Sequence, residues 1–238
     1  MADVFQRHEL KYLVSAEQRA ALEAAMEPHL VPDEHGESTI CNIYYDTPDF
    51  RLIRRSLERP EYKEKLRLRS YGQVEDGTDV FLELKKKAMG IVYKRRILVD
   101  ARETERRLAS GEKLDDDSQI GREIEAFRRF YGDLEPKVVL CYDRTAWFDK
   151  ECRDLRLTFD RNIRFRTEML SLTDPTEGTQ ILAPGQSLLE IKASRAMPMW
   201  LAGALSAGQV RQVSFSKYGR AYQLLANKAH ISETEEEL

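Results

Sequence analysis

The sequence predicts an α+β fold, in which an eight-stranded antiparallel β-barrel carries helices packed on its outside. Eight segments alternate apolar and polar residues with a period of two and end at Gly, Pro, Asp or Asn, which is typical of strands with two different faces. Shorter segments with helical start signals lie between or after them. Eight strands are enough to close a barrel. Hydrophobic residues make up 42% of the 238-residue chain, which is enough to fill a core.

The expected elements follow one another along the chain. Strands are predicted near residues 5–13, 38–46, 64–71, 79–87, 91–99, 137–145, 154–161 and 187–193. Ser15 is followed three residues later by Gln18, and this capping-box pattern predicts a helix that continues to about Met26. Asp46 or Thr47 would cap the start of another helix. Further helices are predicted near residues 101–109, 119–131, 198–207 and 217–228.

One domain is expected over residues 1–229, because no long linker or internal repeat divides the chain. Residues 230–238 are acidic and contain few large apolar groups, so they are predicted to form a mobile tail.

A soluble, cytoplasmic protein without direct membrane insertion is predicted. The first residues lack an apolar signal core, and the longest mostly apolar run, residues 197–208, is too short to cross a bilayer. Cys41, Cys141 and Cys152 are an odd number without CxxC spacing, so the sequence suggests neither a disulfide framework nor a zinc site.

Basic residues gather on one face of several predicted strands. In residues 65–71, a period of two places Lys65, Arg67, Arg69 and Tyr71 on one face and two leucines on the other. The same spacing groups charged or polar residues in other strands: Arg7, Glu9 and Lys11; Glu83, Lys85 and Lys87; Lys94 and Arg96; Tyr142 and Arg144; Arg156, Thr158 and Asp160; and Glu190 and Lys192.

Two interpretations of these charged faces remain open. For a single strand, a face turned toward water is the commonest arrangement. Exposed faces usually mix acids and bases, however, whereas these faces are mainly basic although the whole chain has a net charge of −3. If the charged faces line the inside of the barrel, they need a counter-anion. A mixture of Lys and Arg suits several phosphoryl groups in a row, so a linear triphosphate is a natural guest.

Isolated carboxylates on these faces have two possible roles. Glu9, Glu83 and Glu190 could hold Mg²⁺ or Mn²⁺ against phosphate oxygens, or they could pair with neighbouring lysines. For Glu83 the pairing role is favoured, since it lies in a Glu-x-Lys sequence. ATP would bind along the charged faces, because the chain has no GxxxxGK[ST] loop. No nucleic-acid binding is predicted, because stacking aromatics are not interleaved with the basic strands.

The order of these motifs along the chain resembles a known family. The motifs are Arg7-His8-Glu9-Leu10-Lys11-Tyr12, Tyr44-Tyr45-Asp46-Thr47, residues 65–69, residues 81–87, Tyr93-Lys94-Arg95-Arg96, residues 155–160, Leu188-Leu189-Glu190-Ile191-Lys192 and Ser216-Lys217-Tyr218. Together they resemble the VTC domain, the polyphosphate polymerase module of the vacuolar transporter chaperone family. That family lies within the CYTH-like triphosphate tunnel metalloenzyme superfamily.

The resemblance implies an eight-stranded tunnel in which the γ-phosphate of ATP is transferred to inorganic polyphosphate with a divalent metal, usually Mn²⁺. It implies catalytic roles for Arg67, Arg69, Lys85 and Lys217. It also implies phosphate or nucleotide binding by Lys11, Lys94, Arg144, Arg156, Ser216 and Tyr142, and metal binding by Glu190. Arg7 stands where related phosphatases and cyclases have a second Glu, which argues against a hydrolase site with several metal-binding carboxylates.

Two other functions remain open at this point. A hydrolase of triphosphate or short polyphosphate would use the same cradle with water as the acceptor. A non-catalytic module that binds polyphosphate would keep the cationic residues without metal-dependent turnover. Protein partners are not predicted.

Overall fold

The computed structural model describes residues 8–75, 77–89, 91–150, 154–194 and 196–236. The chain divides into two compact units, and each is described here by itself. Unit 1 comprises Met1–Thr39, Tyr142–Ile163 and Leu182–Phe215, and unit 2 comprises Ile40–Cys141, Arg164–Ile181 and Ser216–Leu238.

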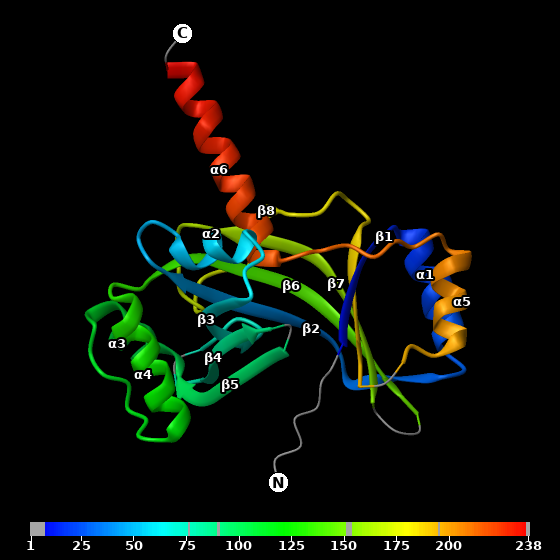
Figure 1. The fold of residues 1–238 in the computed structure, drawn as a ribbon, viewed down its shortest axis with the longest axis horizontal. Coiled ribbons are helices and arrows are strands. Elements are labelled where there is room, and N and C mark those ends of the chain that lie inside the picture. Colours follow the sequence, from blue (N-terminus) through cyan, green and yellow to red (C-terminus); the bar gives the residue numbers. More distant parts are fainter. Residues whose placement is uncertain (1–7, 76, 90, 151–153, 195, 237–238) are drawn as a thin grey trace. The chain divides into compact units, whose positions relative to one another are not determined.

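The structure confirms the predicted α+β class with a large antiparallel sheet (Figure 1). The strands are β1 (His8–Val14), β2 (Leu30–Asp46), β3 (Tyr62–Tyr71), β4 (Asp79–Ala88), β5 (Ile91–Asp100), β6 (Glu135–Asp149), β7 (Leu155–Arg166), β8 (Thr179–Gln180) and β9 (Ser187–Ala193). Their order is β1-β9-β7-β6-β2-β3-β4-β5, and β8 pairs with β7. The sheet has nine strands, and the pairings described do not join β1 to β5, so it is not the closed eight-stranded barrel that was expected.

Six helices accompany the strands in the described part of the chain. They are α1 (Ala16–Met26), α2 (Arg51–Leu57), α3 (Ala101–Ser110), α4 (Gln119–Tyr131), α5 (Met199–Ala207) and α6 (Lys217–Glu236). None of the helices in the described ranges combines the length and the apolar character that a bilayer crossing requires.

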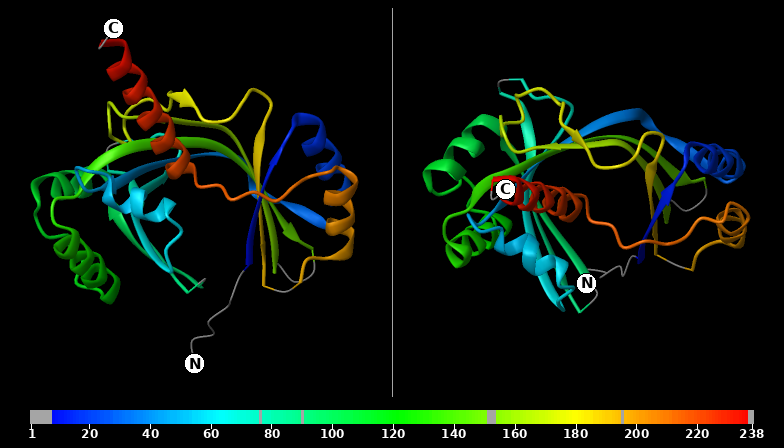
Figure 2. Two further views of the ribbon diagram at one scale, coloured as in Figure 1. Left: turned by 45° about the horizontal axis from the view of Figure 1, so that its top comes forward. Right: turned by 90° about the horizontal axis from the view of Figure 1, so that it is seen from above.

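In unit 1, α1 and α5 pack side by side (Figure 2). The predicted capping box is present, because Ser15 Oγ accepts from Gln18 N at 3.1 Å and Gln18 Oε1 accepts from Ser15 N at 2.9 Å. The apolar faces of β7 and β9, with Leu157, Phe159 and Ile191, form one buried cluster with residues of these helices. Because that cluster takes up one face of the strands, their charged residues lie on the opposite face.

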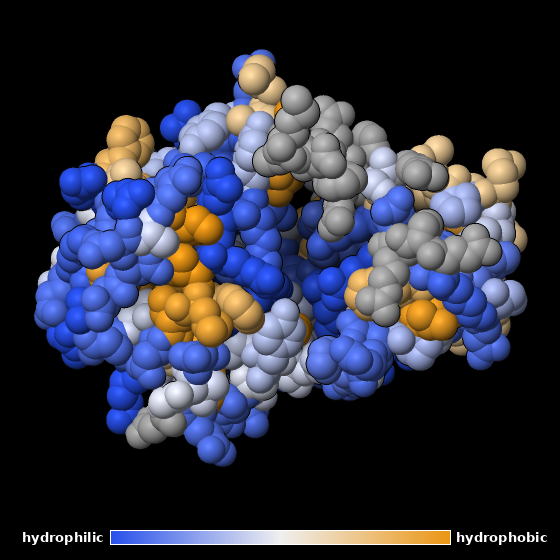
Figure 3. Space-filling model, turned by 90° about the horizontal axis from the view of Figure 1, so that it is seen from below, coloured by the Kyte–Doolittle hydropathy of each residue, from blue (hydrophilic) through white to orange (hydrophobic). Residues whose placement is uncertain are grey.

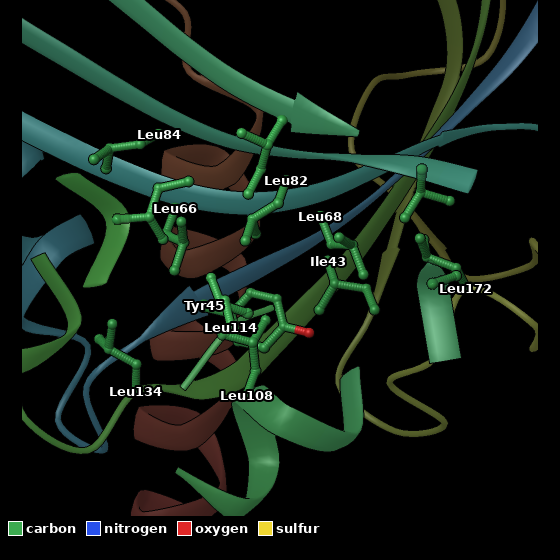
Figure 4. Close-up of a cluster of buried hydrophobic side chains, with 14 of the residues drawn as sticks. Ile43, Tyr45, Leu66, Leu68, Leu82, Leu84, Leu108, Leu114, Leu134 and Leu172 are labelled. Atoms are coloured by element: carbon green, nitrogen blue, oxygen red, sulfur yellow. The ribbon is translucent and has the colours of Figure 1, made fainter. Parts of the chain in front are cut away.

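In unit 2, the apolar faces of β3 and β4 form a core with α3 and α4 (Figure 4). Leu66, Leu68, Leu82 and Leu84 are all fully buried there. Burying one leucine side chain contributes about 1.5–3 kcal/mol. The leucines of β3 and β4 therefore face the helices, and the charged residues lie on the opposite face, as the period of two predicts.

The N-cap of α2 is Phe50 and not Asp46 or Thr47, and the side chain of Phe50 makes no capping hydrogen bond, but Asp46 and Thr47 supply acceptors to the first turn. Asp46 accepts from the backbone N–H groups of Leu52 at 2.8 Å and Ile53 at 3.0 Å, and Thr47 Oγ1 accepts from Arg51 N at 2.9 Å. These contacts satisfy N–H groups that the first turn of a helix cannot pair internally.

The largest departures from the predicted bounds are in β2 and α6. β2 begins at Leu30 and not near residue 38, because its first half is polar and largely exposed and gives no alternating pattern. Gly36 has a φ of +58° in that half. α6 continues past the predicted end at residue 228 into the acidic segment.

Candidate functional site

The charged face of β3, β4 and β5 in unit 2 is arranged in cross-strand rows. Lys65 lies opposite Lys85, which lies opposite Lys94, and we call these three the lysine row. The arginine row is next to it: Arg67 lies opposite Glu83, which lies opposite Arg96. The third row contains Arg69, Phe81 and Leu98. The three rows therefore bring six basic side chains and one carboxylate onto one face.

The lysine row concentrates positive charge at one position of the sheet. Like charges directly opposite each other on neighbouring strands repel and destabilise the pairing. The same three strands also pair Lys63 with Lys87, which extends the positive charge along the face. An arrangement of this kind is suited to binding a ligand with several negative charges.

Glu83 pairs with one cation from each of the three rows. Arg67 donates to Glu83 Oε2 from Nε at 2.8 Å, and Lys94 Nζ lies 2.6 Å from Oε1. Arg69 is at 3.9 Å. Burial alone would raise the pKa of Glu83, but these cations lower it to about 2. Glu83 is thus an ionised partner of three cations, which confirms the pairing role favoured from the sequence.

A second layer of contacts orients the arginines. Arg67 Nη1 donates to Tyr44 Oη at 3.1 Å, and the ring of Tyr44 stacks on Tyr218 at 4.6 Å. Tyr218 in turn donates its hydroxyl to the buried Asp46 at 3.0 Å. Arg69 Nε donates to Asn42 Oδ1 at 3.2 Å.

The Ser216-Lys217-Tyr218 motif lies at the start of α6. Ser216 Oγ accepts from Gly219 N at 3.1 Å, as a helix cap does, and from Lys65 Nζ at 2.9 Å. The motif therefore connects α6 to the lysine row. Because Ser216 Oγ accepts both of these hydrogen bonds, its own O–H proton can be donated to an anion. Lys217 is the first residue of α6.

Unit 1 carries a second charged face, on β1, β9, β7 and β6. Arg144 makes a two-point contact with Asp160, from Nε at 2.6 Å and from Nη2 at 2.7 Å. Arg144 Nη2 also lies 3.5 Å from Glu190, and Lys11 Nζ lies 3.6 Å from the other oxygen of that carboxylate. Although burial opposes its charge, Arg144 has a raised pKa because Tyr142 and Asp160 favour the charged form.

The unit 1 face pairs opposite charges at two positions and like charges at a third. Lys11 lies opposite Glu190, and Glu9 lies opposite Lys192, which in turn lies opposite Arg156. Lys11 Nζ also approaches Glu9 to 3.1 Å and donates to the carbonyl of Phe215 at 3.0 Å. Burial lowers the pKa of Lys192 despite the nearby carboxylates.

Glu190 fits a divalent metal only as a single protein ligand. Within the described ranges, no three His, Cys, Asp or Glu side chains are grouped to hold a metal ion. Thr158 lies opposite Glu190, and its buried Oγ1 has no hydrogen-bond partner among the described residues. One carboxylate with a neighbouring hydroxyl suits Mg²⁺ or Mn²⁺ when water and substrate phosphates complete the shell.

The predicted site residues fall into two groups. Arg67, Arg69, Lys85, Lys94, Ser216 and Lys217 belong to unit 2, and Lys11, Tyr142, Arg144, Arg156 and Glu190 belong to unit 1. Tyr142, expected to contact a nucleotide or phosphate, is only 2% exposed and lies 5.1 Å beneath the guanidinium of Arg144. Arg156 stacks over Phe148 at 4.8 Å. Arg7 and Cys152 lie outside the described residues.

The sequence interpretation did not assign several supporting residues. Lys65, Tyr44, Asn42 and Asp46 each contact a predicted site residue or the residue that supports it. The period of two placed Lys65 on the charged face, but no role of its own followed from the sequence. The hydrogen bonds of Asn42 and Asp46 join distant segments and leave no periodic pattern.

The surface in Figure 3 is mostly hydrophilic, with hydrophobic side chains gathered in separate patches. The large exposed hydrophobic residues of β5 are Val92, Tyr93 and Leu98. Of these, Tyr93 directly precedes the basic residue Lys94.

Comparisons with known proteins agree with the fold. The family model of the VTC domain matches residues 6–226. A crystal structure from Bacillus halodurans, of a proposed adenylate cyclase, is similar with a TM-score of 0.55 and 16% identity, covering 89% of this chain and 95% of that chain. A Vibrio parahaemolyticus structure, also of a proposed adenylate cyclase, gives a TM-score of 0.47 and 12% identity, with 91% and 97% coverage. A search of curated proteins gives no significant match.

Proposed function

Because the chain belongs to the VTC domain family, we propose that it is a polyphosphate polymerase-like phosphotransferase that moves the γ-phosphate of ATP onto a polyphosphate chain. Family membership supports the coarser statement that the protein is an enzyme acting on triphosphates, by phosphotransfer or hydrolysis. The donor, the acceptor and the polymerase reaction are the finer parts of the proposal.

The lysine row is the observation that supports this function most strongly. Lys65, Lys85 and Lys94 lie directly opposite one another on three paired strands, next to the arginine row. A single phosphate would meet only part of this face. A linear chain of phosphoryl groups can contact successive rows, because residues of the same face repeat about every 7 Å along a strand.

In the proposed reaction, a terminal oxygen of the polyphosphate chain attacks the γ-phosphorus of ATP. The bond between that phosphorus and the β–γ bridging oxygen breaks, and ADP leaves with the electron pair. No protein nucleophile is required, since catalysis consists of positioning and charge stabilisation. We assign these roles to Arg67, Arg69, Lys85 and Lys217.

The remaining proposed ligands contribute phosphate binding. Lys94 and Ser216 would do so on the unit 2 face, and Lys11, Arg144 and Arg156 on the unit 1 face. Tyr142 would act through Arg144, whose guanidinium it supports. Glu190 would hold Mn²⁺ or Mg²⁺, which supplies charge neutralisation at phosphate oxygens.

The test is an incubation of the purified protein with ATP and Mn²⁺, with and without a short polyphosphate primer. ADP and chain length are followed together on a gel. Formation of ADP with lengthening chains is the expected result. Free phosphate without longer chains would replace the proposal with hydrolysis, and tight tripolyphosphate binding without turnover would replace it with a binding module.

A further inference from the structure

The charged face of unit 2 changes character at one end. Beyond the lysine and arginine rows, the third row places Phe81 opposite Leu98, with Arg69 on the other side. Tyr71 is two residues beyond Arg69 on β3 and shares its face. Tyr71 is 62% exposed and Leu98 is 57% exposed. An aromatic and aliphatic surface thus continues directly from the cationic rows.

The ring of Phe81 contacts the ring of Tyr71. The two rings meet edge to face, with centroids 6.4 Å apart and an angle of 86°. The guanidinium of Arg96 lies over the ring of Phe81 at 4.7 Å. Phe81 is therefore held between Tyr71 and a residue of the arginine row, while the more exposed Tyr71 has a ring surface available for stacking.

We infer that Tyr71, Phe81 and Leu98 form a subsite for the base of a nucleoside triphosphate whose terminal phosphate lies at the lysine row. The inference rests on the proposed function and adds the orientation of the donor to it. Four residues of β4 separate Lys85 from Phe81, a distance of about 14 Å along the strand, which an extended nucleoside triphosphate can bridge. The arginine row lies between them, at the position of the inner phosphates.

The chemistry of this surface fits a base better than a phosphate. Aromatic rings stack on any nucleotide base, and the planar guanidinium group of an arginine adds to this stacking. The ring of Tyr71 and the side chain of Leu98 offer no charge to a phosphate, so inorganic tripolyphosphate would be bound mainly by the cationic rows. The subsite would therefore favour ATP over inorganic phosphate chains, while the phosphate contacts of the two ligands stay the same.

The experiment compares two ligands by calorimetric titration of the full chain at one Mg²⁺ concentration. The ligands are ATP and inorganic tripolyphosphate, and the variants are Tyr71→Ala, Tyr71→Phe and Tyr93→Ala. Tyr93 is a matched control, because it is 41% exposed and lies on β5 with its side chain on the opposite face from Leu98.

Tyr71→Ala is expected to weaken ATP binding by about fivefold or more and to leave tripolyphosphate binding unchanged. Tyr71→Phe keeps the ring and is expected to bind ATP as the wild type does, and Tyr93→Ala should change neither affinity. Equal effects of Tyr71→Ala on both ligands, or no effect on either, would overturn the subsite while leaving the proposed function in place. A wild-type protein that binds neither ligand would overturn both.

Discussion

The two charged faces are built from the same residue types but distribute their charges differently. On the unit 1 face, two cross-strand pairs join a base to an acid, Lys11 to Glu190 and Glu9 to Lys192, although Lys192 also lies opposite Arg156. On the unit 2 face, Lys65, Lys85 and Lys94 lie opposite one another. Alternating opposite charges stabilise strand pairing, and opposed like charges destabilise it. Carboxylates thus lie opposite cations at two positions of the first face, whereas the second face sets three lysines opposite one another beside Glu83.

The difference indicates that the two faces respond in opposite ways to the loss of a cation. A cation removed from the unit 1 face leaves a buried carboxylate without its partner. Removing Lys85, which lies opposite both Lys65 and Lys94, should relieve repulsion in the free protein and weaken the binding of an anion. The predictions below test this contrast, beginning with the largest expected effect.

Arg144→Ala should lower the free energy of unfolding by about 3–5 kcal/mol, because it leaves the buried Asp160 without its two-point partner. Denaturant unfolding measures the change. Arg106→Ala is the control, since Arg106 makes a similar two-point contact with Glu103 at the surface. Exposed pairs of that kind contribute about 1 kcal/mol or less. Equal losses in the two variants would contradict the buried role of Arg144.

Glu83 should make unit 2 sensitive to acid. Its pKa falls from an ordinary value of 4.5 to about 2 in the folded protein, where cations oppose the effect of burial. A lowered pKa stabilises the fold above the ordinary value, and this stability is lost as the pH falls from about 4.5 toward 2. At about 1.4 kcal/mol for each unit, the contribution at neutral pH is roughly 3 kcal/mol.

The measurement is the free energy of unfolding of the wild type and of Glu83→Gln between pH 7 and pH 3. The difference between them should be largest at pH 7 and shrink below about pH 4.5. Glu103→Gln is the control, because the ion pairs of Glu103 are at the surface and screened by solvent. A difference for Glu83→Gln that stays constant with pH would rule out an ionised carboxylate at that position.

Much of the strand and helix arrangement could be predicted from the sequence. The period of two correctly separated leucines from charged residues in β3, β4 and β9, because a strand between helices and a charged face must alternate. The bounds of α4 and β9 were also predicted closely. The first half of β2 could not be predicted, since its polar residues pair as a strand without burying a regular apolar face.

The cross-strand partners were beyond sequence reasoning. The sequence places Lys65, Lys85 and Lys94 on charged faces, but only the pairing register shows that the three lie opposite one another. Contacts such as that of Asp46 with Tyr218 depend on the tertiary fold. The same holds for Tyr142, whose burial beneath Arg144 is not visible in an alternating pattern.

Glu190→Gln should lower metal-dependent turnover by roughly 100-fold or more, because a metal contributes several kcal/mol of charge stabilisation in the transition state. Tripolyphosphate binding without metal should change little. Mn²⁺ binding, followed by electron paramagnetic resonance, should weaken in the same variant. Glu23→Gln removes a carboxylate of α1 in the same unit and serves as the control. Unchanged turnover and Mn²⁺ binding in Glu190→Gln would remove the metal assignment.

Lys85→Met should have effects of opposite sign on stability and on binding. Without a ligand, the loss of repulsion from Lys65 and Lys94 should raise the free energy of unfolding by up to about 1 kcal/mol. Tripolyphosphate binding should weaken about tenfold, since a charged hydrogen bond contributes about 1.5–3 kcal/mol. Lys86→Met is the matched control, because Lys86 is the next residue and lies 3.7 Å from the buried Glu64 on the other face. It should lower stability slightly and leave binding unchanged. If Lys85→Met instead destabilised the free protein, or bound tripolyphosphate as tightly as the wild type, the lysine row would not be an anion-binding surface, and the contrast between the two faces would have no functional meaning.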